Sequence, residues 1–124
     1  MARVVALVPD LLFGSRVQSM LLAAGHEVEL VGDRERVHGA LLGGGGAPAA
    51  VLVVDLTNED LDGAALVEAL SGAGELDDTR TLGFYAHVDI SVRERAERAG
   101  LDMVVPRSRM AREGAELVAR LLDR

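Results

Sequence analysis

Short apolar runs alternate with amphipathic segments about five times along this chain of 124 residues. The apolar runs are rich in Val and Leu and cover residues 3–8, 27–31, 50–56, 80–86 and 102–105. Most of them are continuous rather than strictly alternating. Continuous runs of this length are typical of strands that are buried on both faces of a parallel sheet. The pattern therefore predicts five buried strands.

Between these runs, apolar residues recur at the spacing of a helix. The expected helices cover residues 13–24, 33–42, 61–70, 91–99 and 109–122. Asp33 is predicted to cap the second helix, and Ser91 with Glu94 to form a capping box at the fourth. Gly25 and Gly100 end the first and fourth helices in the usual C-terminal position. In the last helix, Met110, Val118 and Leu121 are expected to face inward.

Strands that take turns with helices predict an α/β fold, a (βα)5 three-layer sandwich with a parallel five-stranded sheet. The expected strand order is the flavodoxin-like 2-1-3-4-5. We expect one domain over residues 1–124, with no second domain after the last helix. The glycine-rich segment 43–48 is interpreted as a loop, because glycines do not hold a helix or a strand cheaply. A phosphate-binding loop is not expected there, because the segment lacks the Gly-Lys-Ser/Thr continuation and leads into a strand.

Binding and reaction sites in such folds lie beyond the carboxyl ends of the strands. Asp10, Asp55, Tyr85 and Arg107 all fall at these ends. Asp55 is the most conspicuous of them, because it closes the most apolar run of the chain. We therefore expect any functional site to be built around this carboxylate.

The amino-acid composition argues against several classes of function. The net charge of −7 argues against direct binding of nucleic acid, which needs a basic surface. The chain has no cysteine, so thiolate chemistry and cysteine–zinc sites are excluded. All 13 basic residues are arginine, which excludes chemistry that needs a lysine. The apolar runs are too short to span a membrane, and we expect a cytoplasmic protein.

Three segments in order resemble the response-regulator receiver domain, the CheY-like phosphoacceptor module of two-component signalling. They are VVDLTNEDLDG (53–63), FYAHVDISVRERAERAGLD (84–102) and AAGHEV (23–28). The resemblance covers the whole chain. It implies the flavodoxin-like fold, a signalling role rather than an enzymatic one, and Asp55 at the position of the phosphoacceptor.

The chain departs from the receiver pattern at three positions. Where receivers carry an acidic pair that holds Mg²⁺, this sequence has Val8 and Pro9, with Asp10 one residue further on. Where receivers carry a Ser or Thr that senses the phosphoryl group, it has Tyr85. Where receivers carry a Lys that pairs with the acceptor, it has Arg107. The resemblance therefore implies a degenerate receiver, or pseudo-receiver.

These departures weaken the predicted chemistry. Phosphoryl transfer to a carboxylate depends on positioning and charge neutralisation, and Mg²⁺ needs several oxygen ligands. Asp10 and Asp55 supply two carboxylates and the Thr57 carbonyl a third oxygen, so we expect weak Mg²⁺ binding or none. An inward Tyr85 ring would cover Asp55 and occupy the phosphoryl space. Arg107 keeps a positive charge that could neutralise Asp55.

Three functions stay open at this point. The first is a stand-alone signalling module that acts by protein–protein contact, independently of phosphorylation. The second is a working phosphoacceptor that uses Asp55 with Mg²⁺. The third is a small-molecule-binding or enzymatic domain on the same fold. Simpler structural roles also stay open: Asp10 as a turn or helix-cap residue, Asp55 as a solvated strand end, and Tyr85 as a packing aromatic.

The fourth helix is highly charged and forms a candidate association surface. Receivers dock partners or dimerise through helix four, strand five and helix five, so the resemblance implies a protein partner or a homodimer there. Arg93, Met103, Arg107 and Met110 are the candidate contact residues, because exposed Met and Arg are enriched in interfaces. The alternative is a charged face that contacts only water.

Overall fold

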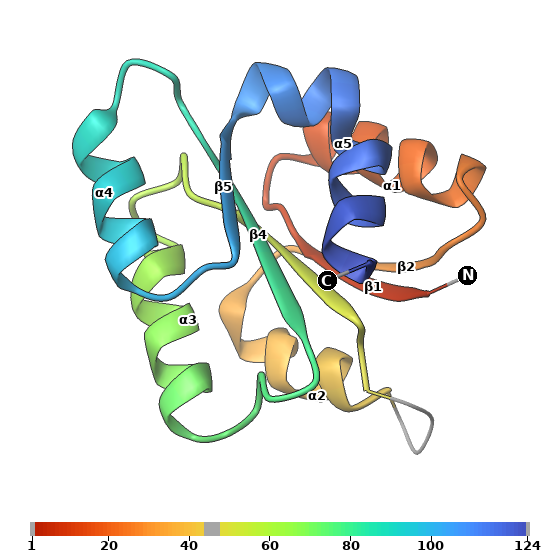
Figure 1. Ribbon diagram of the computed structural model, residues 1–124, viewed down its shortest axis with the longest axis horizontal. Helices are drawn as coiled ribbons and strands as arrows, with labels where there is room; N and C mark the ends of the chain where they lie inside the picture. The colour runs from red at the N-terminus through yellow and green to blue at the C-terminus, as the bar shows by residue number, and fades with distance from the viewer. Residues whose placement is uncertain (1, 44–47, 124) are drawn as a thin grey trace.

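The computed structural model describes residues 2–43 and 48–123 and shows a single five-stranded sheet, in the order β2-β1-β3-β4-β5 (Figure 1). All four strand pairs are parallel. The strands are β1 (Arg3–Leu7), β2 (Glu27–Val31), β3 (Val51–Asp55), β4 (Arg80–Tyr85) and β5 (Met103–Pro106). The predicted fold class and strand order are confirmed. Of the expected glycine-rich loop, residues 44–47 lie outside the described part.

Helices cover both faces of the sheet, as the three-layer prediction requires (Figure 1). They are α1 (Leu11–Ala23), α2 (Val37–Leu42) after a short 3-10 turn η1 (Arg34–Arg36), α3 (Gly63–Gly72), α4 (Ile90–Arg98) and α5 (Arg107–Leu122). One apolar cluster joins the sheet to α1 and α5, and a second joins it to α2, α3 and α4. The core is therefore divided into two layers by the sheet.

The central strands are buried on both faces, which explains why their sequences are continuous apolar runs. All five residues of β3 are buried. In the edge strand β2, by contrast, Glu27 and Glu29 are exposed, and only Val31 at its end is fully buried. An edge strand is covered less completely, so its sequence alternates.

Helix starts were predicted less accurately than the strands. Asp89, rather than Ser91, caps α4: its Oδ1 accepts from the Val92 amide, and the Ser91 hydroxyl donates to the same oxygen. The predicted Ser91–Glu94 capping box is therefore wrong. The helix α5 begins at Arg107, directly after Pro106, because the extended backbone of this proline leads into the first turn.

Candidate functional site

Asp55 lies at the carboxyl end of β3, between the loops that follow its two neighbouring strands β1 and β4. Its side chain is almost buried, with 4% of the residue exposed. It forms part of an open groove of about 550 Å³ that is lined by Pro9, Asp10, Asp55, Thr57 and Asn58. The structure thus brings Asp10 and Asp55 to one groove, as the sequence predicted.

Thr57 holds the Asp55 carboxylate through two hydrogen bonds. The Thr57 amide donates to Oδ1 at 2.8 Å, and the Thr57 hydroxyl donates to the same oxygen at 2.6 Å. The sequence prediction used only the backbone carbonyl of Thr57 and missed these donors. An Asp-x-Thr spacing directly after a strand is the signal that could have found them, because an Asp side chain commonly accepts from the backbone two residues on.

Asp10 caps α1. Its Oδ1 accepts from the Leu12 amide at 3.0 Å and from the Phe13 amide at 3.1 Å, which satisfies two of the open donors at the helix start. Its Oδ2 faces Arg107, whose Nη2 lies 3.4 Å away. The helix-cap role that the sequence left open for Asp10 is therefore confirmed.

Arg107 is held by Asp10 and by an aromatic ring. Its guanidinium lies 4.2 Å from the centroid of the Phe13 ring, within the range of a cation–π contact. Among the residues that the structure describes, Asp55 forms no ion pair with Arg107 or any other cation. The interpretation that Arg107 neutralises Asp55 is wrong, because the arginine is directed to Asp10 instead.

Tyr85 does not cover Asp55. Asp55 pairs in register with Phe84, and successive residues of a strand face opposite sides of the sheet. Phe84 packs in the cluster under α1 and α5, and Tyr85 packs on the other side of the sheet, in the cluster under α2, α3 and α4. Asp55 is on the side of Phe84, so the Tyr85 ring points away from it. Tyr85 is 5% exposed and is not among the residues that line the groove. The expectation of a ring over Asp55 is wrong, and the packing role is confirmed.

The groove does not offer a ready magnesium site. Both oxygens of Asp10 are engaged, one by two backbone amides and the other by Arg107. Within residues 2–43 and 48–123, no group of three His, Cys, Asp or Glu side chains could hold a metal ion. Mg²⁺ requires near-octahedral oxygen ligation, which this donor set does not fit. Weak or absent Mg²⁺ binding stays a prediction, now with a physical reason.

The predicted association surface is only partly exposed. Arg93 is exposed and pairs with Glu97 along α4 at 3.7 Å. Met103 is half-buried against the cluster under α1 and α5. Met110 has no exposed surface at all. Its inward orientation is confirmed, and its proposed contact with a partner is wrong, because the side chain lies wholly in the core.

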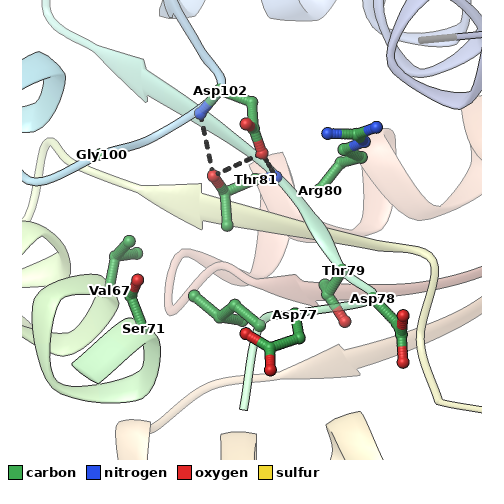
Figure 2. A pocket seen from close by; sticks show the side chains of 10 residues that line it. Val67, Ser71, Asp77, Asp78, Thr79, Arg80, Thr81, Gly100 and Asp102 are labelled. Atoms are coloured by element: carbon green, nitrogen blue, oxygen red, sulfur yellow. Dashed lines mark hydrogen bonds between the residues drawn. The ribbon is translucent and has the colours of Figure 1, made fainter. Parts of the chain in front are cut away.

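A hollow of about 410 Å³ lies at the amino-terminal ends of the strands, away from Asp55, where β4 begins (Figure 2). Asp102 accepts from the Thr81 amide at 2.8 Å and donates its own amide to the Thr81 hydroxyl at 2.9 Å. These bonds join the starts of β4 and β5. They give Asp102 a structural role, away from the groove at Asp55.

No protein-family model matches the chain, and no curated protein matches its sequence. Solved structures do match its fold. A candidate response regulator from Chloroflexus aurantiacus is similar at 19% identity and a TM-score of 0.86, covering 99% of this chain and 98% of that one. The receiver domain of a Francisella response regulator is similar at 15% identity and a TM-score of 0.84, covering 99% and 98%.

A CheY-like receiver domain protein from Methanospirillum hungatei is also similar, at 15% identity and a TM-score of 0.83, covering 99% of this chain and 94% of that one. At such identities the likeness establishes the fold, and the chain has the fold of response-regulator receiver domains over nearly its whole length. Within the described residues, no helix is both long and apolar enough to cross a membrane.

Proposed function

We propose that this chain is a receiver-type signalling module that acts through protein–protein contacts and not through phosphorylation of Asp55. The observation that carries this proposal is the ion pair between Arg107 and Asp10. Receiver chemistry as implied by the resemblance needs a cation and a second carboxylate directed to the acceptor. In this chain these two groups bind each other.

The charge balance at Asp55 supports the proposal. The carboxylate is nearly buried and is held by two Thr57 donors, and no described cation pairs with it. A phosphoryl group would add negative charge at the same place. Without a preorganised positive charge, the transition state of phosphoryl transfer loses most of its electrostatic stabilisation. A binding module is therefore a better account than an enzyme or an efficient phosphoacceptor.

A working phosphoacceptor is the second candidate. The specific observation in its favour is that the groove is open: Tyr85 is not among its lining residues, and Asp10 is present in the same groove. If Arg107 left Asp10, both carboxylates would face the groove. This candidate requires that rearrangement before any phosphoryl transfer.

The candidate contact surface for a partner comprises α4, β5 and the exposed side of α5. Its exposed charged residues include Arg93 on α4 and Arg107 at the start of α5. Met103, at the start of β5, is half-buried. Arg93 and Arg107 each already pair with a carboxylate of this chain. A partner would have to exchange these exposed ion pairs, which are worth little individually.

Nuclear magnetic resonance with a phosphoryl mimic tests the proposal. Backbone amide spectra of the ¹⁵N-labelled chain would be compared before and after addition of beryllofluoride with Mg²⁺. We expect no saturable shifts in the loop 55–62 or in α4. Saturable shifts there that disappear in Asp55→Asn would favour the phosphoacceptor instead. Asp60→Asn, an exposed aspartate of the same loop, is the matched control.

A further inference from the structure

The outward face of α1 differs in charge from the rest of the molecule. The chain has a net charge of −7 and 27% charged residues, yet α1 contains no acidic residue and only one basic one, Arg16. The buried residues of α1 are Phe13, Gly14, Val17 and Leu21. The opposite side of the helix is therefore an exposed and nearly uncharged surface.

Four residues form a stripe along this outward side, which we name the α1 stripe: Leu12, Ser15, Ser19 and Leu22. Leu12 is 86% exposed and Leu22 50% exposed. The steps between the four positions are three, four and three residues, the spacing at which side chains line up on one side of a helix and form a helix–helix seam. Leucine stands at both ends and serine in the middle.

The order of the α1 stripe is the same from either end. An antiparallel copy of α1, related by a two-fold axis that crosses the outward side of the helix midway between Ser15 and Ser19, would place Leu12 against Leu22 of the second copy. The same operation places Ser15 against Ser19 of the second copy. A two-fold interface must be complementary to itself, and this arrangement meets that condition. The small serine side chains at the centre let two helices approach closely.

We propose that the α1 stripe is a surface for association with a second copy of this chain, in a two-fold antiparallel arrangement of the α1 helices. Charge supports this occupant. Two copies that each carry −7 repel one another over most orientations, and the α1 face lets them meet without opposing carboxylates. Burial of the two exposed leucines supplies the driving force.

The proposed dimer is weak, because the α1 stripe is short. A helix of 13 residues is about 20 Å long, so an interface confined to one face of it lies at the small end of specific interfaces. Its salt dependence is distinctive. Salt screens the repulsion between the two acidic copies, so association strengthens as salt is added. An interface through the charged α4 surface would instead weaken if ion pairs held it.

Sedimentation velocity from about 10 μM to about 1 mM tests the proposal over the range of a weak dimer. We expect the wild type to approach dimer mass as concentration rises. Leu12→Glu should weaken association at least about tenfold, because it buries a charge in the seam. Leu42→Glu, which adds the same charge at a leucine that is 57% exposed on α2, should leave association unchanged.

Two results would overturn the proposal. The first is a monomer at every concentration and salt. The second is a dimer that survives Leu12→Glu but is lost on changing Arg93 and Met103. Orientation is tested by cross-linking, since the chain has no cysteine. A mixture of Leu12→Cys and Leu22→Cys should react with a short bis-maleimide more than either variant alone; equal reaction of Leu12→Cys alone would contradict the antiparallel arrangement.

Discussion

Arg107 and Asp10 meet at 3.4 Å, from Nη2 to Oδ2, and so join the start of α5 to the start of α1. The same guanidinium lies 4.2 Å from the centre of the Phe13 ring. The planar, delocalised cation of arginine can stack on a ring and bind a carboxylate at once, whereas a lysine ammonium is a compact point charge. The arginine at this position therefore binds Asp10 and stacks on Phe13, and it does not pair with Asp55. Among the described residues, Thr57 alone donates hydrogen bonds to the Asp55 side chain.

Asp55→Asn should stabilise the fold. Asparagine keeps an Oδ1 that accepts from both Thr57 donors, and it removes a nearly buried charge without a described cationic partner. We expect the free energy of unfolding to rise by about 1 kcal/mol, as measured by urea denaturation at neutral pH. Asp60→Asn, which removes an exposed charge, should change it little. A loss of stability in Asp55→Asn would show that a favourable charge interaction at Asp55 had been removed.

Arg107→Gln should increase the affinity for Mg²⁺. The substitution frees one oxygen of Asp10 and removes a cation from the edge of the groove. Two unit charges about 4 Å apart in a water-like medium interact by about 1 kcal/mol, and Mg²⁺ carries two charges, so we expect the dissociation constant to fall at least roughly fivefold. Isothermal titration calorimetry measures it. Arg112→Gln removes an exposed arginine that is bonded to the Ser108 carbonyl and should leave the affinity unchanged. Equal changes in both variants would point to a general charge effect.

Asp10→Ala should destabilise the chain through the lost helix cap. Two amides at the start of α1, those of Leu12 and Phe13, lose their acceptor. The expected loss is about 1 kcal/mol in the free energy of unfolding, measured by chemical denaturation. Asp10→Asn retains a capping oxygen and should lower the free energy of unfolding by only about 0.3 kcal/mol. Equal losses in the two variants would mean that the ion pair to Arg107, and not the cap, carries the contribution of Asp10.

Gly83→Ala should destabilise the core between β4 and the layer formed by α2, α3 and α4. A Cβ at this position would lie 2.6 Å from Leu101 Cδ2 and 2.7 Å from Leu56 Cδ1. Overpacking of this kind costs about 1–3 kcal/mol, which thermal or chemical unfolding would detect. A Cβ at Gly39 in α2 would meet no described atom within 4 Å apart from the local helix backbone, so Gly39→Ala should instead stabilise by about 0.5–1 kcal/mol. A neutral Gly83→Ala would contradict the close packing of Leu56 and Leu101 described here.

The sheet was predictable because its signal is local. Most strands are continuous apolar runs, and their alternation with helices indicates a parallel sheet, for which the observed order β2-β1-β3-β4-β5 is a common doubly wound arrangement. The capping role of Asp10 could also be predicted from the sequence, since an Asp before an apolar helical segment is a common signal for a helix start. The cap of α4 was missed because Ser91 and Glu94 match a capping box as well as Asp89 matches a simple cap. Local propensity alone does not choose between such competing starts.

The site was less predictable because it depends on contacts between distant residues. Asp10 and Arg107 are 97 positions apart, and only the packing of α1 beside α5 brings them together. The direction of Tyr85 depends on the register of β4 against β3, where Phe84 takes the place opposite Asp55. A sequence places a residue at the end of a strand, but register decides which face its side chain joins.

Intact mass after incubation with acetyl phosphate and Mg²⁺ tests most directly whether Asp55 acts as a phosphoacceptor. Wild type, Asp55→Asn and Arg107→Gln would be compared at neutral pH. Since Arg107 binds Asp10 and no cation within residues 2–43 and 48–123 pairs with Asp55, we expect no phosphoryl adduct on the wild type. A single adduct on the wild type that is absent from Asp55→Asn would contradict the proposed phosphorylation-independent function.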